Sequence, residues 1–352
     1  MRSIRHAGGA LLAGLLLVAV SAAPALACGG LIGPNGSVNL LRTTTFAAYH
    51  DGVEHYITSF EFAGGGGAFG SLTPLPGVPT SVVKGGDWTL QRLIRETNPV
   101  PAAEFFSLDS AGGRASAEVL MQVQIDALDI TVLRGGAAEV GTWATDHGFR
   151  LPPDAPEVLE FYAARSQIFL AAAFDGDAAA ARGQNVGDGT PVHITIPTEN
   201  PWVPLRILAL GKTGSEVVQA DVYLMTDRKP AMLPVPDGFN GMTLDNSQPA
   251  SESLLADLRS DRGMEWVPKE AWLSKIALDG EASKFGYDLA IDASGARAPS
   301  RVAAGLDLPG AADPTGPTLI RTLGAMMFIV GTLGALAVLI TRRPTGGGLH
   351  PA

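Results

Sequence analysis

The sequence has one cysteine in 352 residues, few aromatic side chains and fewer basic than acidic groups. A single cysteine, Cys28, excludes an internal disulfide framework. Aromatic residues make up 7% of the chain, and the formal net charge is −10. A surface of this sign repels nucleic acid, so we expect no nucleic-acid partner.

Long apolar runs occur only near the two ends, and the first has the features of an export signal. Basic residues at the start are followed by "ALLAGLLLVAV", which is short for a membrane span. Ala25 and Ala27 then supply the small side chains that signal peptidase requires. We predict a signal peptide over residues 1–27, cut between Ala27 and Cys28. Lipidation of Cys28 is the alternative, disfavoured because Ala25 stands where lipoproteins have a branched apolar residue.

The second apolar run, Leu323 to Ile340, contains eighteen residues without a charge. As a helix it is about 27 Å long, close to the hydrocarbon thickness of about 30 Å. Arg342 and Arg343 follow directly, and positive residues stay on the cytoplasmic side. We predict a transmembrane helix over 318–341 and a cytoplasmic tail over 342–352. The chain is then a single-pass cell-membrane protein with its N-terminal domain outside.

The segment between these runs divides into a domain and a linker. Residues 293–317 are rich in Ala, Gly and Pro and predict a flexible linker. Residues 28–292 are long enough for an extracytoplasmic domain with its own core. The ends hold no acidic residue and five of the 25 Lys and Arg, so the exported part has 20 bases against 35 acids, or −15.

Short-range patterns in the domain predict more strands than helices. Residues 119–126 and 191–197 alternate between apolar and polar, which indicates half-buried strands. Asp51-Gly52 predicts a two-residue hairpin turn. Three helices are expected: one capped by Asp87, one at 137–148, and one opened by a capping box of Asp154 and Glu157. The fold class is α+β, with a mainly antiparallel sheet.

Several segments, in this order, resemble one bacterial family. They are "ACGGLIGPNGSV", "YHDGVEHYITSFEFAGGGGAFGSLTPLPGVP", "WTLQRLIRETNP", "GFRLPPDAPEVLEFYAARSQIFLAAAF" and "WVPLRILALG". Their succession resembles domain of unknown function 2330 over most of residues 28–230. The resemblance implies an exported or membrane-anchored bacterial protein without an established activity, and the Ala- and Gly-rich style resembles actinobacterial members. Residues 230–292 match the family less well.

The sequence offers weak candidates for chemistry. His50 and His55 flank the expected hairpin turn on one face, within reach of one metal ion, but no third ligand is apparent. "SVVK" (81–84) and "KTG" (212–214) resemble penicillin-binding-protein motifs but lack the required helix start. Residues 175–189 are acidic and Gly-rich but lack a calcium ligand pattern, and predict a flexible polar loop. We therefore predict no catalytic residues and no cofactor.

Together these features favour a non-catalytic binding or cell-envelope assembly module, anchored in the membrane and engaging an envelope protein or the cell wall. The alternative is a cell-envelope hydrolase, with a metal at His50 and His55.

Overall fold

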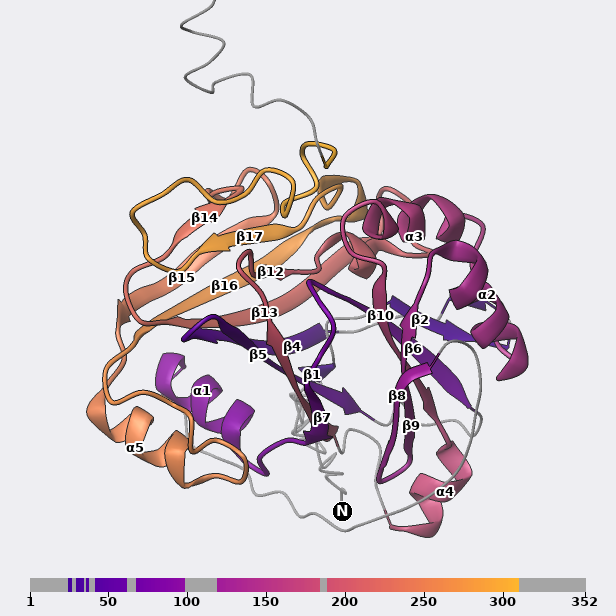
Figure 1. The fold of residues 1–352 in the computed structure, drawn as a ribbon, viewed down its shortest axis with the longest axis horizontal. Helices are drawn as coiled ribbons and strands as arrows, with labels where there is room; N and C mark the ends of the chain where they lie inside the picture. The colour runs from indigo at the N-terminus through magenta and orange to yellow at the C-terminus, as the bar shows by residue number, and fades with distance from the viewer. Residues whose placement is uncertain are drawn as a thin grey trace, which may run out of the picture. The chain divides into compact units, whose positions relative to one another are not determined.

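The computed structural model describes residues 25–26, 30–34, 36–37, 42–61, 68–98, 119–183 and 189–309. The chain divides into two compact units, Met1–Leu306 and Asp307–Ala352. The first unit holds every helix and strand described below, and Figure 1 shows their arrangement.

The largest sheet has eight strands in the order β15-β16-β13-β4-β5-β11-β7, with β1 also paired to β4. All pairs are antiparallel except β1 with β4 and β13 with β4. Its strands are β1 (Ala25–Leu26), β4 (Arg42–His50), β5 (Val53–Glu61), β7 (Ser81–Lys84), β11 (Gly189–Pro197), β13 (Val217–Thr226), β15 (Met242–Pro249) and β16 (Trp272–Glu281).

Two further sheets complete the strand structure, and all of their pairs are antiparallel. The six-stranded sheet has the order β3-β2-β6-β10-β9-β8, and the three-stranded sheet has the order β12-β17-β14. The first contains β2 (Gly30–Gly33), β3 (Gly36–Ser37), β6 (Phe69–Leu75), β8 (Val119–Ile125), β9 (Leu128–Arg134) and β10 (Ile168–Phe174); the second contains β12 (Trp202–Val203), β14 (Ala231–Leu233) and β17 (Leu289–Asp292).

Helices are few among the described residues, and Figure 1 shows where they lie beside the sheets. The fold class predicted from the sequence, α+β with mainly antiparallel sheets, is confirmed. The helices are α1 (Thr89–Thr97), α2 (Ala137–Asp146), α3 (Ala155–Ala163), α4 (Gly176–Ala181) and α5 (Glu252–Ser260), with short 3-10 turns η1 (Arg206–Ala209) and η2 (Ala282–Lys284).

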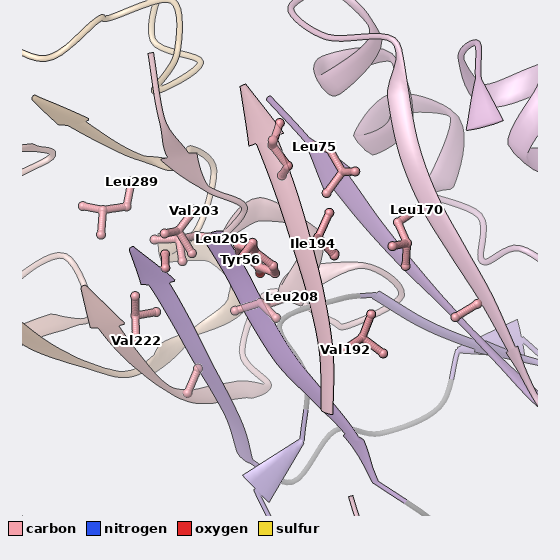
Figure 2. Packing of buried hydrophobic residues seen from close by; sticks show 14 of the residues in the cluster. Tyr56, Leu75, Leu170, Val192, Ile194, Val203, Leu205, Leu208, Val222 and Leu289 are labelled. Carbon is pink, nitrogen blue, oxygen red and sulfur yellow. The ribbon is translucent and has the colours of Figure 1, made fainter. Parts of the chain in front are cut away.

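Three apolar clusters define four layers, helix–sheet–sheet–helix. The central cluster joins the two large sheets, with Val192 and Ile194 from β11 opposite Leu75 and Leu170 (Figure 2). A second cluster joins the outer face of the six-stranded sheet to α2 and α3. A third joins the outer face of the eight-stranded sheet to α1 and α5. Successive residues of a strand pack into different clusters, because side chains alternate between the two faces of a strand.

The strand predictions are largely confirmed. Val192, Ile194 and Ile196 of β11 are fully buried in the central cluster, as the alternation predicts. The hairpin turn joins β4 to β5 at Asp51 and Gly52, whose φ angles of 49° and 79° are those of a two-residue turn with two left-handed positions. In β8 the pairing register shifts between Val119 and Met121, so the predicted alternation holds only beyond this irregularity.

Both predicted local helix caps are wrong. The Asp87 side chain does not cap α1, and this helix has no side-chain cap bond; the Asp261 carboxylate accepts from the backbone amides of residues 87 and 88, just before the helix. Asp154 makes no cap bond to α3, because its carboxylate accepts from the Gly211 amide at 2.9 Å. In both places, a carboxylate is bonded to backbone amides far away in the sequence and not to the neighbouring amides that the local pattern predicted.

Two other predicted segments have more structure than expected. The predicted loop 175–189 contains α4, which Asp175 caps by accepting from the Ala178 amide at 2.9 Å. The predicted linker begins at 293, but the first compact unit continues to Leu306, and Ala303 and Ala304 are buried in the second cluster.

The α2 prediction is confirmed, since that helix ends before a glycine at φ 75°.

Candidate functional sites: a histidine pair and an aromatic loop

The two histidines predicted as metal ligands lie on one face of the hairpin but have different partners. His50 pairs across the hairpin with Val53, and His55 pairs with Ala48. His50 places Nδ1 2.6 Å from the Asp227 carboxylate. His55 places Nδ1 3.0 Å from Nε2 of His193 on β11. The structure therefore joins His55 to a residue 138 positions away in sequence.

The His55–His193 pair is covered by an aromatic side chain from the segment after α5. The ring of Trp266 stacks on His55 with centroids 3.6 Å apart and planes 6° from parallel. His55 and His193 are 8% and 4% exposed. Burial lowers the pKa of His55 to about 3, assisted by His193, and burial lowers the pKa of His193 to about 4. Both rings are neutral at pH 7, so one donates N–H and the other accepts.

The pairing occupies one nitrogen of each ring, Nδ1 of His55 and Nε2 of His193. A nitrogen engaged in this hydrogen bond offers no lone pair to a metal ion. Within the described residues no group of three or more His, Cys, Asp or Glu side chains could hold a metal ion. A metal bound through His50 and His55 stays a prediction. His193 was not assigned as a partner, because no sequence spacing links β5 to β11.

The remaining sequence-predicted positions fall in two groups. Ala27, Cys28, Arg342 and Arg343 lie outside the described residues, as do the signal peptide up to residue 24 and the segment 318–341. No helix in the described ranges is long and apolar enough to cross a bilayer. "SVVK" forms edge strand β7, and its Lys84 pairs with Asp126 at 3.0 Å instead of facing a serine across a helical turn.

Glu54, the neighbour of His55 on β5, is another buried ionisable group, and it lies on the opposite face of the strand. Glu54 is 1% exposed, and burial raises the pKa of its carboxyl to about 8, slightly opposed by the Trp202 backbone amide. Neither carboxyl oxygen makes a hydrogen bond of ordinary geometry with a described residue. The neutral acid is therefore the form that the fold holds at pH 7.

Among the described residues of the first unit, the two most exposed large apolar side chains lie in one loop, residues 234–241 between β14 and β15, here called the aromatic loop. Phe239 is 88% exposed and Val235 is 65% exposed. Sequence reasoning missed this loop, although its "PDGFNG" stretch places an aromatic between two turn glycines. Those glycines, Gly238 and Gly241, have φ angles of 85° and 79°.

The aromatic loop is held by its own polar groups. Asp237 accepts from the Phe239 amide at 2.9 Å, and the Asn240 side chain donates to the Val235 carbonyl at 2.9 Å. The Gly238 amide donates to the Met242 carbonyl at 2.7 Å, which ties the loop to the start of β15. The loop therefore presents an aromatic ring from a fixed backbone.

Two acidic residues and one basic residue lie on or beside the aromatic loop. Asp237 and Asp279 are exposed, and the Asp279 backbone amide donates to the Gly241 carbonyl at 2.9 Å. Lys284 lies beside Gly241, since a methyl group placed on this glycine would be 3.5 Å from Cδ of Lys284. Two acids therefore stand beside one base at this loop.

Fold and sites together define a class of protein: an α+β domain of two facing sheets with buried polar pairs and one exposed aromatic loop. The chain belongs to the family described as uncharacterized protein conserved in bacteria (DUF2330), whose model matches residues 22–232. This confirms the family resemblance found in the sequence. The match ends before the aromatic loop. No curated protein matches the chain.

Solved structures similar to the chain include those of baculovirus P35. A mutated baculovirus P35 after caspase cleavage, at 3.1 Å resolution, has a TM-score of 0.37, 7% identity, and coverage of 73% of this chain and 99% of that chain. Baculovirus P35 itself has a TM-score of 0.34 and 9% identity, covering 72% and 91%. TM-scores this low support no inference about the fold or the function of this chain.

Proposed function

We propose that the chain is a membrane-anchored, extracytoplasmic binding module of the bacterial cell envelope, without catalytic activity of its own. Its location rests on the signal-like start over residues 1–27 and on the uncharged run followed by Arg342 and Arg343. Its role rests on the aromatic loop. The partner is a component of the envelope.

The observation that carries this role is the exposure of Phe239 on a hydrogen-bonded loop. A phenylalanine left 88% exposed gives up the burial that stabilises most aromatic side chains. Aromatic residues are enriched in the cores of protein interfaces, where they fill pockets. Rigid presentation reduces the entropy lost on binding. By contrast, the rings of His55 and His193 bond to each other, and Trp266 stacks on His55.

Photo-crosslinking in intact cells tests the proposal. The full chain carries benzoylphenylalanine at position 239, which keeps an aromatic ring there, or at position 83 as control. Val83 is also exposed, at 44%, but lies on β7, at the edge of the eight-stranded sheet opposite to β15 and the aromatic loop. A discrete adduct from position 239 that is missing from position 83 supports a binding surface at the loop. Equal labelling from both positions, or none from 239, contradicts it.

A further inference from the structure

We infer that the aromatic loop inserts Phe239 into an apolar pocket of a partner protein, and that this pocket has basic groups at its rim. The inference rests on the proposed binding function and names the chemistry of the partner. Three observations carry it: the fixed shape of the loop, the exposure of its two apolar side chains, and the sign of the charges around them.

Several hydrogen bonds fix the shape of the loop. One carboxylate oxygen of Asp237 accepts from the amides of Phe239 and Asn240, at 2.9 and 3.3 Å. Asn240 in turn accepts from the Met242 amide at 3.1 Å and, through its carbonyl, from the Tyr287 hydroxyl at 3.3 Å. Pro236, which is buried, fixes one further φ angle inside the loop. A preformed loop loses little entropy when it enters a pocket of complementary shape, whereas insertion into a fluid bilayer requires no fixed shape.

The charges favour a basic protein surface over the membrane. Asp237 lies two residues before Phe239 in the loop, Asp279 is bonded to the loop through its backbone amide, and Lys284 lies beside Gly241. Bacterial headgroups that are anionic repel such a loop, and the −15 balance of the exported part acts in the same direction. Basic residues at a pocket rim attract it and raise the rate of association. Phe239 and Val235 supply the apolar contact, and the acids supply orientation.

Benzoylphenylalanine at position 239 of the full chain identifies the occupant by the mass of the adduct. We expect a protein adduct. In the double variant Asp237→Asn, Asp279→Asn, we expect the adduct yield to fall about tenfold. This is the effect of losing rim charges that contribute about a factor of ten in affinity. Asp237→Asn keeps an oxygen that can accept from the loop amides, and Asp279→Asn alone, which leaves the loop bonds intact, should show part of the same loss.

The outcomes separate the inference from the proposed function. A lipid adduct would overturn the protein partner while leaving a binding surface at the loop. A protein adduct whose yield is unchanged, or rises, in Asp279→Asn and in the double variant would overturn the basic rim. No adduct from position 239 would remove the proposed function and this inference together. A control variant, Glu270→Gln, changes the same charge on an exposed residue and should leave the yield unchanged.

Discussion

The carboxylate of Asp261 lies 2.7 Å from the hydroxyl of Thr89, and the two residues are 172 positions apart. The same carboxylate accepts from the backbone amides of residues 87 and 88, so the residue directly after α5 is bonded to the segment that leads into α1. Gly86 permits this approach, because a methyl group there would lie 2.1 Å from an oxygen of Asp261.

Asp261→Ala should lower the free energy of unfolding by about 1–3 kcal/mol, the usual cost of removing the acceptor of buried polar groups. Thr89 is fully buried and would lose the acceptor of its hydroxyl. Chemical denaturation measures the change, and hydrogen exchange should show faster opening of α1. Asp87→Ala is the matched control, with a loss below about 0.5 kcal/mol. Equal losses in both variants would mean that the hydrogen bonds of Asp261 do not stabilise the start of α1.

The pair Arg165–Asp288 gives a second stability prediction. Their atoms are 2.6 Å apart, at side-chain exposures of 4% and 0%, and Asp288 also accepts from Tyr162 and from two backbone amides. Arg165→Met leaves a buried carboxylate without its cation, so we expect a loss of about 3–5 kcal/mol in the free energy of unfolding.

The control for this pair is an exposed one. Arg262 pairs with Asp87 at the surface, and Arg262→Met should cost less than about 1 kcal/mol. Urea denaturation of both variants gives the comparison. If Arg165→Met cost no more than Arg262→Met, the buried pair would contribute little to the fold.

The histidine pair predicts loss of stability in acid. Unfolded histidines bind protons near pH 6.5, whereas His55 and His193 in the fold do so only near pH 3 and 4. Below pH 6.5 the unfolded state therefore binds more protons. The free energy of unfolding should fall toward pH 4, by up to about 1.4 kcal/mol per pH unit for each histidine.

Denaturation midpoints between pH 4 and 7 measure this slope. Replacing both residues, with His55→Gln and His193→Gln, should flatten it, and His147→Gln at the end of α2 is the control that should retain it. An unchanged slope in the double variant would show that other groups cause the acid sensitivity.

Glu54 acts in the opposite direction. Its pKa is about 8 in the fold and 4.5 in the unfolded chain, so the folded state binds the extra proton between these values. Stability from this group is complete below pH 4.5 and is lost as the pH rises to 8 and above. Glu54→Gln keeps the shape without the charge, so it should be more stable than the parent chain at pH 8 and should flatten this decline. Lower stability at pH 8 would contradict the neutral buried acid; Glu270→Gln is the exposed control.

Local features of the fold could be predicted from the sequence, and distant pairings could not. The Asp51-Gly52 turn and the buried alternation of β11 depend on neighbouring residues, so short windows identify them. The carboxylate bonded to the segment before α1 comes from Asp261, and the partner of His55 comes from β11, so no window contains both members.

The aromatic loop illustrates a different limit. Gly238 and Gly241 mark a turn in the sequence, but the turn signal does not say whether the phenylalanine between them is buried. That depends on what the rest of the chain packs against it. Exposure became apparent only with the fold, where Phe239 extends from a loop held by Asp237 and Asn240.

Cysteine labelling in intact cells tests the central claim, an exported module whose aromatic loop is occupied by a partner. In a full chain with Cys28→Ser, a membrane-impermeant maleimide is applied to Val83→Cys, on the sheet edge opposite to the loop, and to Val235→Cys, which keeps Phe239, and rates are compared with the purified chains. Both positions are exposed, at 44% and 65%. The account predicts that position 83 reacts in cells as fast as in the purified chain, while position 235 reacts several times more slowly. Equal rates at both positions, or no labelling of either in intact cells, would contradict it.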